Sequence, residues 1–281
     1  MSPPEIVVLG GPNSGKTHFA GQLYGRLQRR PEALRLRQDA GTPPDLHVLE
    51  EVLRCLESGR AAAHTASATW DTVSLPLVDT QERPMDLRWP DYGGEQINAV
   101  TKDRLVSEHW RERLVAASGW LLFIRLRNEI TYPDRLATLT DGPPETADPE
   151  TRKDWDANAK LVELLQILLH VGEIGTVKRI TAPRLAVLLS CYDEQGGGLQ
   201  PPREALRARL PLLSSFIESN WRAESLSIWG LSSLGRLLKE DSSDDAFIDS
   251  GPEFQGWIVP PEGGKRDPDL TAPLAWILEG A

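Results

Sequence analysis

The chain has 281 residues, of which 40% are hydrophobic and 26% charged, a composition that predicts a folded globular protein. Asp and Glu outnumber Lys and Arg by 41 to 31, and the resulting net charge of −10 argues against binding to duplex nucleic acid. Two cysteines are too few for a disulfide framework or a zinc site. We find neither a membrane-spanning apolar run nor a secretory signal, and therefore expect a cytoplasmic protein without a membrane span.

In chain order, the first half of the sequence predicts strands and helices in alternation. Apolar or alternating runs predict strands at residues 6–9, 72–78 and 85–89. Helical spacing runs from His18 to about Arg29, and again over 31–58 around a break at 41–44. Pro76 cannot donate a ladder hydrogen bond, so it predicts an edge position for the second strand. The small, polar residues 59–71 predict a loop.

The second half continues the same alternation. Helical spacing predicts helices at 98–117, 155–171 and 203–218, with a further helix over 231–238. Buried strands are predicted at 119–126, 185–189 and 226–229. Residues 140–154 predict an exposed insertion and 240–252 an acidic flexible stretch. The last element, at 268–280, is a helix or strand expected to pack through Leu270, Leu274, Trp276 and Ile277. Strands that alternate with helices indicate a doubly wound α/β sheet.

The strongest motif is a phosphate loop. Residues 10–17 fit G-x-x-x-x-G-K-[ST] between a predicted strand and a predicted helix. Backbone N–H groups of such a loop wrap a phosphate, and Gly10 and Gly15 allow the close approach. Lys16 would place its charge on the β- and γ-oxygens, and Thr17 would offer Mg²⁺ a hydroxyl ligand. The predicted nucleotide contacts here are Gly10, Gly11, Pro12, Asn13, Ser14, Gly15, Lys16, Thr17 and His18.

A nucleotide site of this kind needs an acidic residue that holds Mg²⁺ from a neighbouring strand. Asp91 follows the 85–89 strand and begins a D-x-x-G pattern, in which Gly94 would bring a backbone N–H to the γ-phosphate. Asp79 ends the 72–78 strand, but no glycine follows at that spacing and Pro76 weakens the strand. We therefore favour Asp91 as the metal ligand, with Asp79 as the alternative.

Two later turns are candidates for contacts with the base. The segment from Ser190 to Asp193 follows a buried strand, and the Asp193 carboxylate could accept hydrogen bonds from the N1–H and exocyclic amine of guanine, which adenine lacks. An ordinary acidic turn is the alternative interpretation. Ser232 and Ser233 lie in the turn after the last core strand, where a second base-contacting loop is expected. Cys191 completes the predicted contacts of this region.

These motifs together resemble the TRAFAC-class, Ras-like GTPases. More narrowly, they resemble the bacterial double-GTPase type of domain, whose members occur in multi-gene conflict or defence-like systems. The resemblance spans about residues 5–240 and rests on residues 10–17, 91–95, 119–125, 190–193 and 230–235. It implies a Ras-like P-loop NTPase fold, three-layer α/β/α, with a mostly parallel central sheet and one antiparallel edge strand.

The resemblance also implies a domain organisation. The GTPase domain would cover residues 1–240 and carry insertions at about 31–58 and 127–154. Residues 241–281 would form a C-terminal extension packed on the same domain, and the segments 256–259 and 269–271 look like the tail of the double-GTPase group.

In function, the resemblance implies a Mg²⁺-dependent protein that binds GTP and GDP, hydrolyses GTP slowly and acts as a switch. Glu95 and Gln96 stand where many relatives carry a water-orienting Gln, and Cys191 replaces the lysine that normally covers the base. An effector or activating protein, for which another GTPase is one candidate, would read the switch. The predicted catalytic residues are Lys16, Glu95, Gln96 and Arg60, and the predicted metal ligands are Thr17, Asp91, Thr65 and Thr69.

Several alternatives remain open at the level of sequence. Arg60 is either an arginine finger acting in cis or a solvated surface residue. The whole chain is alternatively an ATP-using P-loop protein, either an ATPase or a kinase. Residues 127–154 are dominated by acids and prolines, which argues against the arginine-rich lid of a kinase. A third possibility is a nucleotide-binding interaction module without turnover.

Overall fold

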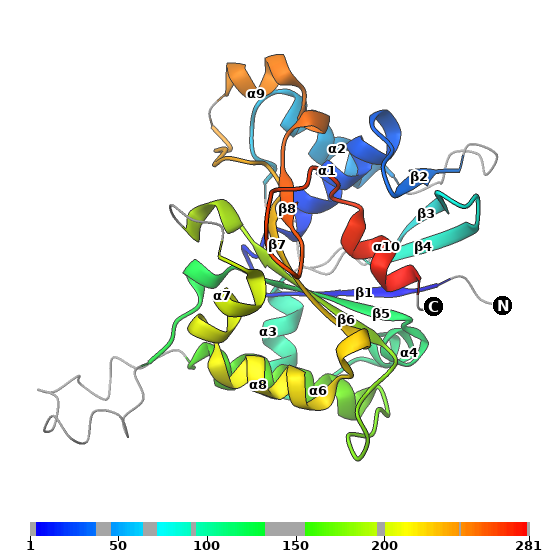
Figure 1. The fold of residues 1–281 in the computed structure, drawn as a ribbon, viewed down its shortest axis with the longest axis vertical. Helices are drawn as coiled ribbons and strands as arrows, with labels where there is room; N and C mark the ends of the chain where they lie inside the picture. The colour runs from blue at the N-terminus through cyan, green and yellow to red at the C-terminus, as the bar shows by residue number, and fades with distance from the viewer. Residues whose placement is uncertain are drawn as a thin grey trace, which may run out of the picture.

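The computed structural model describes residues 4–37, 46–63, 72–90, 94–132, 155–195, 200–241 and 243–279. Within these ranges, a five-stranded sheet with the order β1-β5-β6-β7-β8 forms the centre of the molecule (Figure 1). Its parallel strands are β1 (Ile6–Leu9), β5 (Gly119–Ile124), β6 (Arg184–Ser190) and β7 (Leu226–Ser232). The edge strand β8 (Trp257–Val259) is antiparallel to β7. The expected mostly parallel sheet with an antiparallel edge strand is confirmed.

The central strands are continuous apolar runs because the sheet is covered on both faces. All six residues of β5 and all seven of β7 are buried, which is the pattern of a parallel sheet between two helical layers. The register pairs Ile124 of β5 with Leu189 of β6, and Ser190 with Leu231 of β7. The carboxyl ends of these strands therefore meet at one edge of the sheet.

A second, antiparallel sheet has the order β2-β3-β4 and consists of β2 (Leu34–Leu36), β3 (Thr72–Asp79) and β4 (Pro84–Pro90). β4 lies next to β1 of the main sheet (Figure 1). The prediction of a helix over 31–58 is wrong for residues 34–36, which pair with β3. The later part of that prediction is confirmed as α2 (His47–Glu57).

The prediction that Pro76 marks an edge strand is also wrong, because β3 is the middle strand of its sheet. The strand β2 ends at Leu36, opposite Leu77, so the missing N–H of Pro76 falls just beyond the end of the paired segment. The carbonyl of Pro76 still accepts a hydrogen bond from the Arg37 N–H at 2.9 Å. A short partner strand thus accommodates the proline without an unpaired ladder position.

Helices cover both faces of the main sheet and complete the three layers (Figure 1). One face buries its apolar side chains against α3 (Gly94–Asp103), α4 (Glu108–Ala116), α6 (Ala157–Val171), α7 (Pro202–Arg209) and α8 (Pro211–Asn220). The other face packs against α1 (Lys16–Arg29), α2 and α10 (Ala272–Leu278). Short 3₁₀ helices occur at η2 (Leu126–Asn128), η4 (Tyr192–Gln195), η5 (Ala223–Ser225) and η6 (Pro252–Phe254). In the described part of the chain, no helix has both the length and the apolar character to cross a bilayer.

Two of the predicted helices are each divided in two. The segment 98–117 separates into α3 and α4, because Arg104 adopts a left-handed φ of 53° and Ser107 caps the next helix, accepting from the Trp110 N–H at 3.3 Å. The segment 203–218 separates into α7 and α8 at Leu210, since Pro211 can start a helix but cannot continue one.

Two predictions near the C-terminus are corrected. Residues 231–238 are not helical: β7 runs to Ser232, whose hydroxyl accepts from the Gly235 N–H at 3.0 Å and closes a turn. Residues 245–250, predicted as part of a flexible stretch, form α9. Asp244 caps this helix by accepting from the Phe247 N–H at 2.8 Å, and Phe247 is fully buried.

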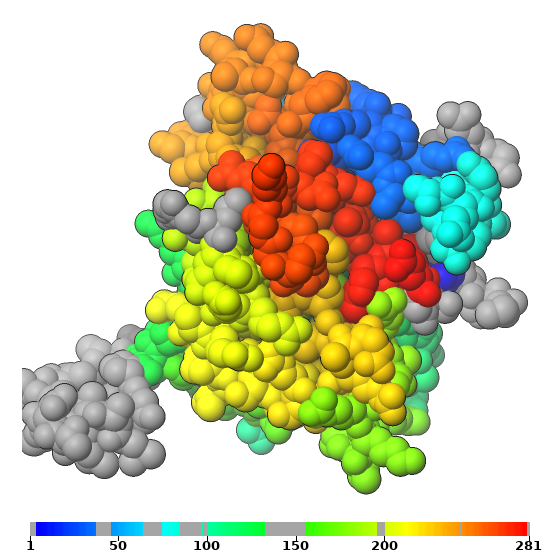
Figure 2. Space-filling model, viewed as in Figure 1, coloured from blue at the N-terminus to red at the C-terminus, as the bar shows by residue number. Residues whose placement is uncertain are grey.

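The C-terminal segment packs into the same core as the phosphate-loop helix. Figure 2 shows it lying across the surface between the N-terminal region and the α7–α8 region. Arg26 of α1 is fully buried and donates to the carbonyls of Gln255 (2.6 Å) and Gly256 (3.2 Å). Leu270, Leu274 and Ile277, which the sequence predicted as packing residues, are fully buried, whereas Trp276 is partly buried.

Gly119→Ala should lower the free energy of unfolding by about 1–3 kcal/mol, the usual cost of overpacking a core. A Cβ at Gly119 would lie 2.2 Å from Cγ2 of Ile277, which α10 holds fully buried. Chemical denaturation would measure the loss, with Gly175→Ala as the matched control because no atom lies within 4 Å of a Cβ there. Equal stability of the two variants would contradict the packing of α10 against β5.

Candidate functional site

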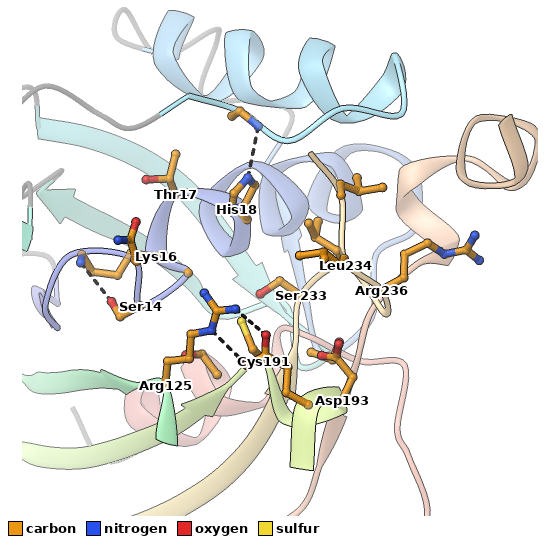
Figure 3. A pocket seen from close by; sticks show the side chains of 18 of the residues that line it. Ser14, Lys16, Thr17, His18, Arg125, Cys191, Asp193, Ser233, Leu234 and Arg236 are labelled. Carbon is orange, nitrogen blue, oxygen red and sulfur yellow. Dashed lines mark hydrogen bonds and ion pairs between the residues drawn. The ribbon is translucent and has the colours of Figure 1, made fainter. Parts of the chain in front are cut away.

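A cavity of about 580 Å³ opens where the parallel strands end (Figure 3). Five parts of the chain line it: four lie at the carboxyl ends of β1, β5, β6 and β7, and the fifth precedes β3. The lining residues are Pro12 to His18, Ala62 and Ala63, Arg125 and Arg127, Ser190, Cys191, Asp193 and Glu194, and Ser232, Ser233, Leu234, Arg236, Leu237 and Leu238. The predicted phosphate loop and the two predicted base-contacting turns therefore face one cavity.

The phosphate loop is shaped by its glycines. A Cβ at Gly10, whose φ is 150°, would lie 2.8 Å from Oγ of Ser14 and 2.9 Å from the Phe123 carbonyl oxygen. Gly15 takes a φ of 84° and stands at the N-cap of α1. Both positions require a residue without a side chain, which explains the spacing of the motif.

Lys16 lies folded against its own loop. Its Nζ donates to the carbonyls of Gly10 and Gly11, both at 2.8 Å, and to Oγ of Ser14 at 3.1 Å. The helix α1 begins at Lys16 and has no acidic side chain in its first turn. The positive end of the helix dipole, the N–H groups at the start of α1 and a lysine thus converge on one end of the cavity, which makes that end suited to bind an anion.

The described start of the predicted loop 59–71 contacts the same helix. His18 accepts a hydrogen bond at Nε2 from the Ala62 N–H at 3.1 Å. This contact holds residues 61–63 beside the phosphate loop, whereas the side chain of Arg60 is exposed and does not line the cavity. Thr65 and Thr69 lie outside the described residues.

Thr17 is the described residue that fits a Mg²⁺ ligand. It lines the cavity beside Lys16, and Mg²⁺ in nucleotide sites commonly takes one or two protein oxygens together with phosphate and water oxygens. No group of three or more metal-binding side chains occurs in the described part of the chain. Asp91 lies outside that part, as do the side chains of Glu95 and Gln96, while Gly94 is the first residue of α3.

Asp79, the alternative metal ligand, has a structural role in the β3–β4 turn. Its carboxylate accepts from the N–H groups of Gln81 and Arg83, both at 2.9 Å, and from Nε of Arg83 at 2.6 Å. These hydrogen bonds, led by the backbone N–H of Arg83, hold the pKa of Asp79 below its ordinary value. Asp79 does not line the cavity, so the structure does not bring it to the phosphate loop.

At the opposite end of the cavity, a buried tyrosine anchors the turn that carries Asp193. The Tyr192 hydroxyl donates to the Gln200 carbonyl at 2.6 Å, and its ring covers Gly230, where a Cβ would come within 2.6 Å. Asp193, the next residue, is exposed on the cavity side of η4 (Figure 3). Ser190 is buried, and a Cβ at Gly15 would lie 3.7 Å from its Cβ. The start of this turn therefore lies against the phosphate loop.

The turn after β7 forms the facing wall. The Ser232 hydroxyl closes the turn itself, so Ser233 and Leu234 are the side chains that Figure 3 shows toward the cavity. Gly256, with a φ of 78°, passes so close that a Cβ there would lie 2.3 Å from the Ser233 carbonyl oxygen. The C-terminal segment therefore supports this wall from behind.

Sequence reasoning missed several residues of the cavity, notably Arg125, Glu194 and Arg236. Arg125 follows β5 and donates from Nε to Glu194 at 3.1 Å and also from Nη2 to the same carboxylate. This hydrogen bond with Glu194 holds the pKa of the Arg125 guanidinium above its ordinary value. Arg236 pairs with Asp244 at 3.2 Å. The signal that could have found Arg125 and Glu194 is that each follows a predicted parallel strand, because the ends of neighbouring parallel strands lie side by side.

Cys191 gives the site a pH dependence of stability. Burial raises the pKa of its thiol to about 11, against an ordinary value of 9.0. The unfolded chain therefore releases this proton first, so the free energy of unfolding is unaffected below pH 9 and falls as the pH rises from 9 to 11. Urea unfolding measures the free energy of unfolding at pH 8 and at pH 10. Between these two pH values, the wild type should lose about 1 kcal/mol more of it than Cys191→Ala does. Equal losses would contradict a thiol whose pKa is raised by folding.

Comparison with known proteins decides the family. The sequence profile of the family described as Double-GTPase 1 matches residues 7–277, which include every segment that lines the cavity. The chain belongs to the Double-GTPase 1 family. The resemblance predicted from the phosphate loop and the later turns is thus confirmed, and this Double-GTPase 1 chain is a P-loop protein of the GTPase type. Among curated proteins, none matches it.

Comparison with solved structures finds matches that are distant in sequence and have TM-scores below 0.5. Toc33 from Arabidopsis thaliana is 13% identical, with 99% of this chain and 84% of that one covered and a TM-score of 0.43. The signal recognition particle receptor SRb–SRX complex from Chaetomium thermophilum is 13% identical, with 89% of this chain and 98% of that one covered and a TM-score of 0.38. Methanosarcina barkeri Roco2, solved with GDP, is 14% identical, with 89% of this chain and 48% of that one covered and a TM-score of 0.33. The Double-GTPase 1 chain spans about half the length of that Roco2 chain.

Proposed function

We propose that this Double-GTPase 1 protein binds Mg²⁺ with GTP or GDP in the cavity, hydrolyses GTP slowly and acts as a nucleotide switch in the cytoplasm. One observation carries the proposal: a complete phosphate loop and the Asp193 turn lie at opposite ends of a single cavity. An anion-binding end and a carboxylate end suit a nucleoside polyphosphate whose base donates hydrogen bonds.

The residues of the loop supply the electrostatic part of the chemistry. Lys16 would exchange its bonds to the Gly10 and Gly11 carbonyls for bonds to the β- and γ-phosphate oxygens. Thr17 would hold Mg²⁺, which when bound neutralises charge on the phosphates. The N–H groups at the start of α1 would stabilise the charge that develops as water attacks the γ-phosphorus and GDP leaves.

Slow turnover follows from the residues after the D-x-x-G pattern. Glu95 is the second residue of α3, where the resemblance to Ras-like GTPases implies a water-orienting Gln, and a carboxylate beside a γ-phosphate would repel it. An arginine supplied by another protein accelerates such hydrolysis by about 10³–10⁵. We therefore infer an activating or effector protein, with another GTPase as one candidate. The resemblance to bacterial double-GTPase domains supports a role in a defence-like system of several proteins.

Single-turnover phosphate release from Mg·GTP tests this function. We expect a rate at or below about 10⁻³ s⁻¹, the scale of a Ras-like protein without a partner, and none when EDTA removes the metal. Mg·ATP serves as the parallel substrate. Faster release from ATP would favour the ATP-using alternative, and tight GTP binding without phosphate release over a day would favour an interaction module.

A further inference from the structure

The turn that follows β6, residues 191–194, carries a carboxylate that can accept hydrogen bonds from the edge of a base, but it carries no cation to cover the face of the base. Cys191 stands at the position where the resemblance to Ras-like GTPases implies a lysine, and its thiol, whose pKa burial raises to about 11, carries no charge near pH 7. Tyr192 is buried beneath the turn, which leaves Asp193 to face the base edge. The lysine that normally covers the base has no counterpart within this turn.

A cation reaches the same place from the neighbouring strand. Arg125 directly follows β5, whose last residue Ile124 pairs with Leu189, so Arg125 lies level with Ser190 and one residue short of Cys191. Arg125 and Cys191 both line the cavity and interact electrostatically. Figure 3 shows the Arg125 side chain rising from β5 toward the space between the phosphate loop and Asp193.

Glu194 fixes the orientation of this guanidinium. The carboxylate accepts from both Nε and Nη2 of Arg125, so it pairs with one edge of the planar group. The side chains of Arg125 and Glu194 are only 23% and 15% exposed, which makes the pair more rigid than a surface ion pair. An edge-paired guanidinium keeps its flat faces available for stacking on an aromatic ring.

We propose that Arg125, held by Glu194, takes the place of the missing lysine and stacks on the face of the bound nucleobase. This inference rests on the proposed nucleotide function. The charge of Arg125 is already balanced by Glu194, which makes it a poor phosphate ligand, and Lys16 serves the phosphates at the other end of the cavity. Stacking does not distinguish between purines, so Arg125 adds affinity while Asp193 adds selectivity.

The test is Arg125→Met, which keeps an apolar stem and removes the planar cation. The probes are Mg·GDP, Mg·IDP (which lacks the exocyclic amine) and inorganic pyrophosphate, measured by calorimetry. We expect GDP and IDP to bind about tenfold more weakly and pyrophosphate to bind unchanged. Unchanged GDP binding, weaker pyrophosphate binding or an altered GDP-to-IDP ratio would each overturn the proposal.

A rescue experiment separates this role from a merely structural ion pair. Adding Cys191→Lys to Arg125→Met restores the lysine, and a left-handed φ of 50° at this position tolerates an unbranched side chain. We expect GDP binding to return to within about threefold of the wild type. A failure to rescue would overturn the proposal, because an ion-pair defect in the turn would persist.

Two controls keep the outcome clear. Arg207→Met breaks an exposed ion pair with Glu218 away from the cavity and should leave GDP binding unchanged. If Arg125→Met does not fold, Arg125→Lys retains a cation for Glu194 and should still weaken GDP binding through loss of the planar face. No loss in that variant would overturn the proposal. Absence of GDP binding by the wild type would show instead that the proposed function itself is wrong.

Discussion

Lys16→Ala is expected to weaken Mg·GTP binding at least about 100-fold, a loss of about 2.8 kcal/mol. Nζ of Lys16 lies 2.8 Å from two loop carbonyls and places a cation at the anion-binding end of α1. Charge-assisted hydrogen bonds to phosphate contribute about 1.5–3 kcal/mol each, and the variant loses all of those that the lysine makes. Calorimetry with Mg·GTPγS measures the change.

The matched control for this prediction is Lys239→Ala, which removes an exposed lysine that does not line the cavity. It should bind Mg·GTPγS as the wild type does. Circular dichroism should show that Lys16→Ala keeps its fold, since α1 retains Phe19 and Leu23 in the core. Binding within threefold of the wild type would contradict a phosphate site at this loop.

Asp193→Ala is expected to erase discrimination between guanine and adenine nucleotides. The carboxylate lies exposed on the cavity side of η4, where a turn anchored by Tyr192 holds it. Removing an acceptor for two donors of guanine should cost GTP binding about tenfold or more, whereas ATP, which lacks those donors, should bind as before. The measurement is the ratio of the two dissociation constants in the variant and in the wild type.

Asp249→Ala on α9 controls for the loss of one negative charge, because Asp249 is exposed and outside the cavity lining. It should leave the ratio unchanged. A wild-type ratio that survives Asp193→Ala would mean that the segment 190–193 is the ordinary acidic turn considered as the alternative from sequence.

The sequence predicted best those features that depend on neighbouring residues. The phosphate loop is local: Gly10, Gly15 and Lys16 carry its geometry within eight positions. The buried strands and α6 were predictable for the same reason, since a continuous apolar run or a helical stripe is visible without knowledge of the partner. The family resemblance built on these segments agrees with the match over residues 7–277.

Features that depend on distant pairing were missed. An antiparallel edge strand was expected, but its position at β8 was not, because β8 has only three residues and is defined by its pairing with β7. Pro76 was assigned to an edge because a proline does not reveal that its partner strand ends one residue earlier. Arg125 escaped notice because its role depends on Glu194, a residue 69 positions away that only the parallel register brings near.

Helix boundaries were lost for a different physical reason. A left-handed residue such as Arg104 interrupts a helix without any glycine or proline to mark it. The turn after β7 was predicted as helical from its leucines. Three of these, Leu234, Leu237 and Leu238, instead line the cavity as part of an irregular segment.

Competition calorimetry of Mg·GTPγS against Mg·ATPγS on the full chain tests the central claim most directly. A phosphate loop and the Asp193 turn in one cavity predict that GTPγS binds at least tenfold more tightly, a difference of about 1.4 kcal/mol. Equal or tighter binding of ATPγS would contradict a guanine-specific site.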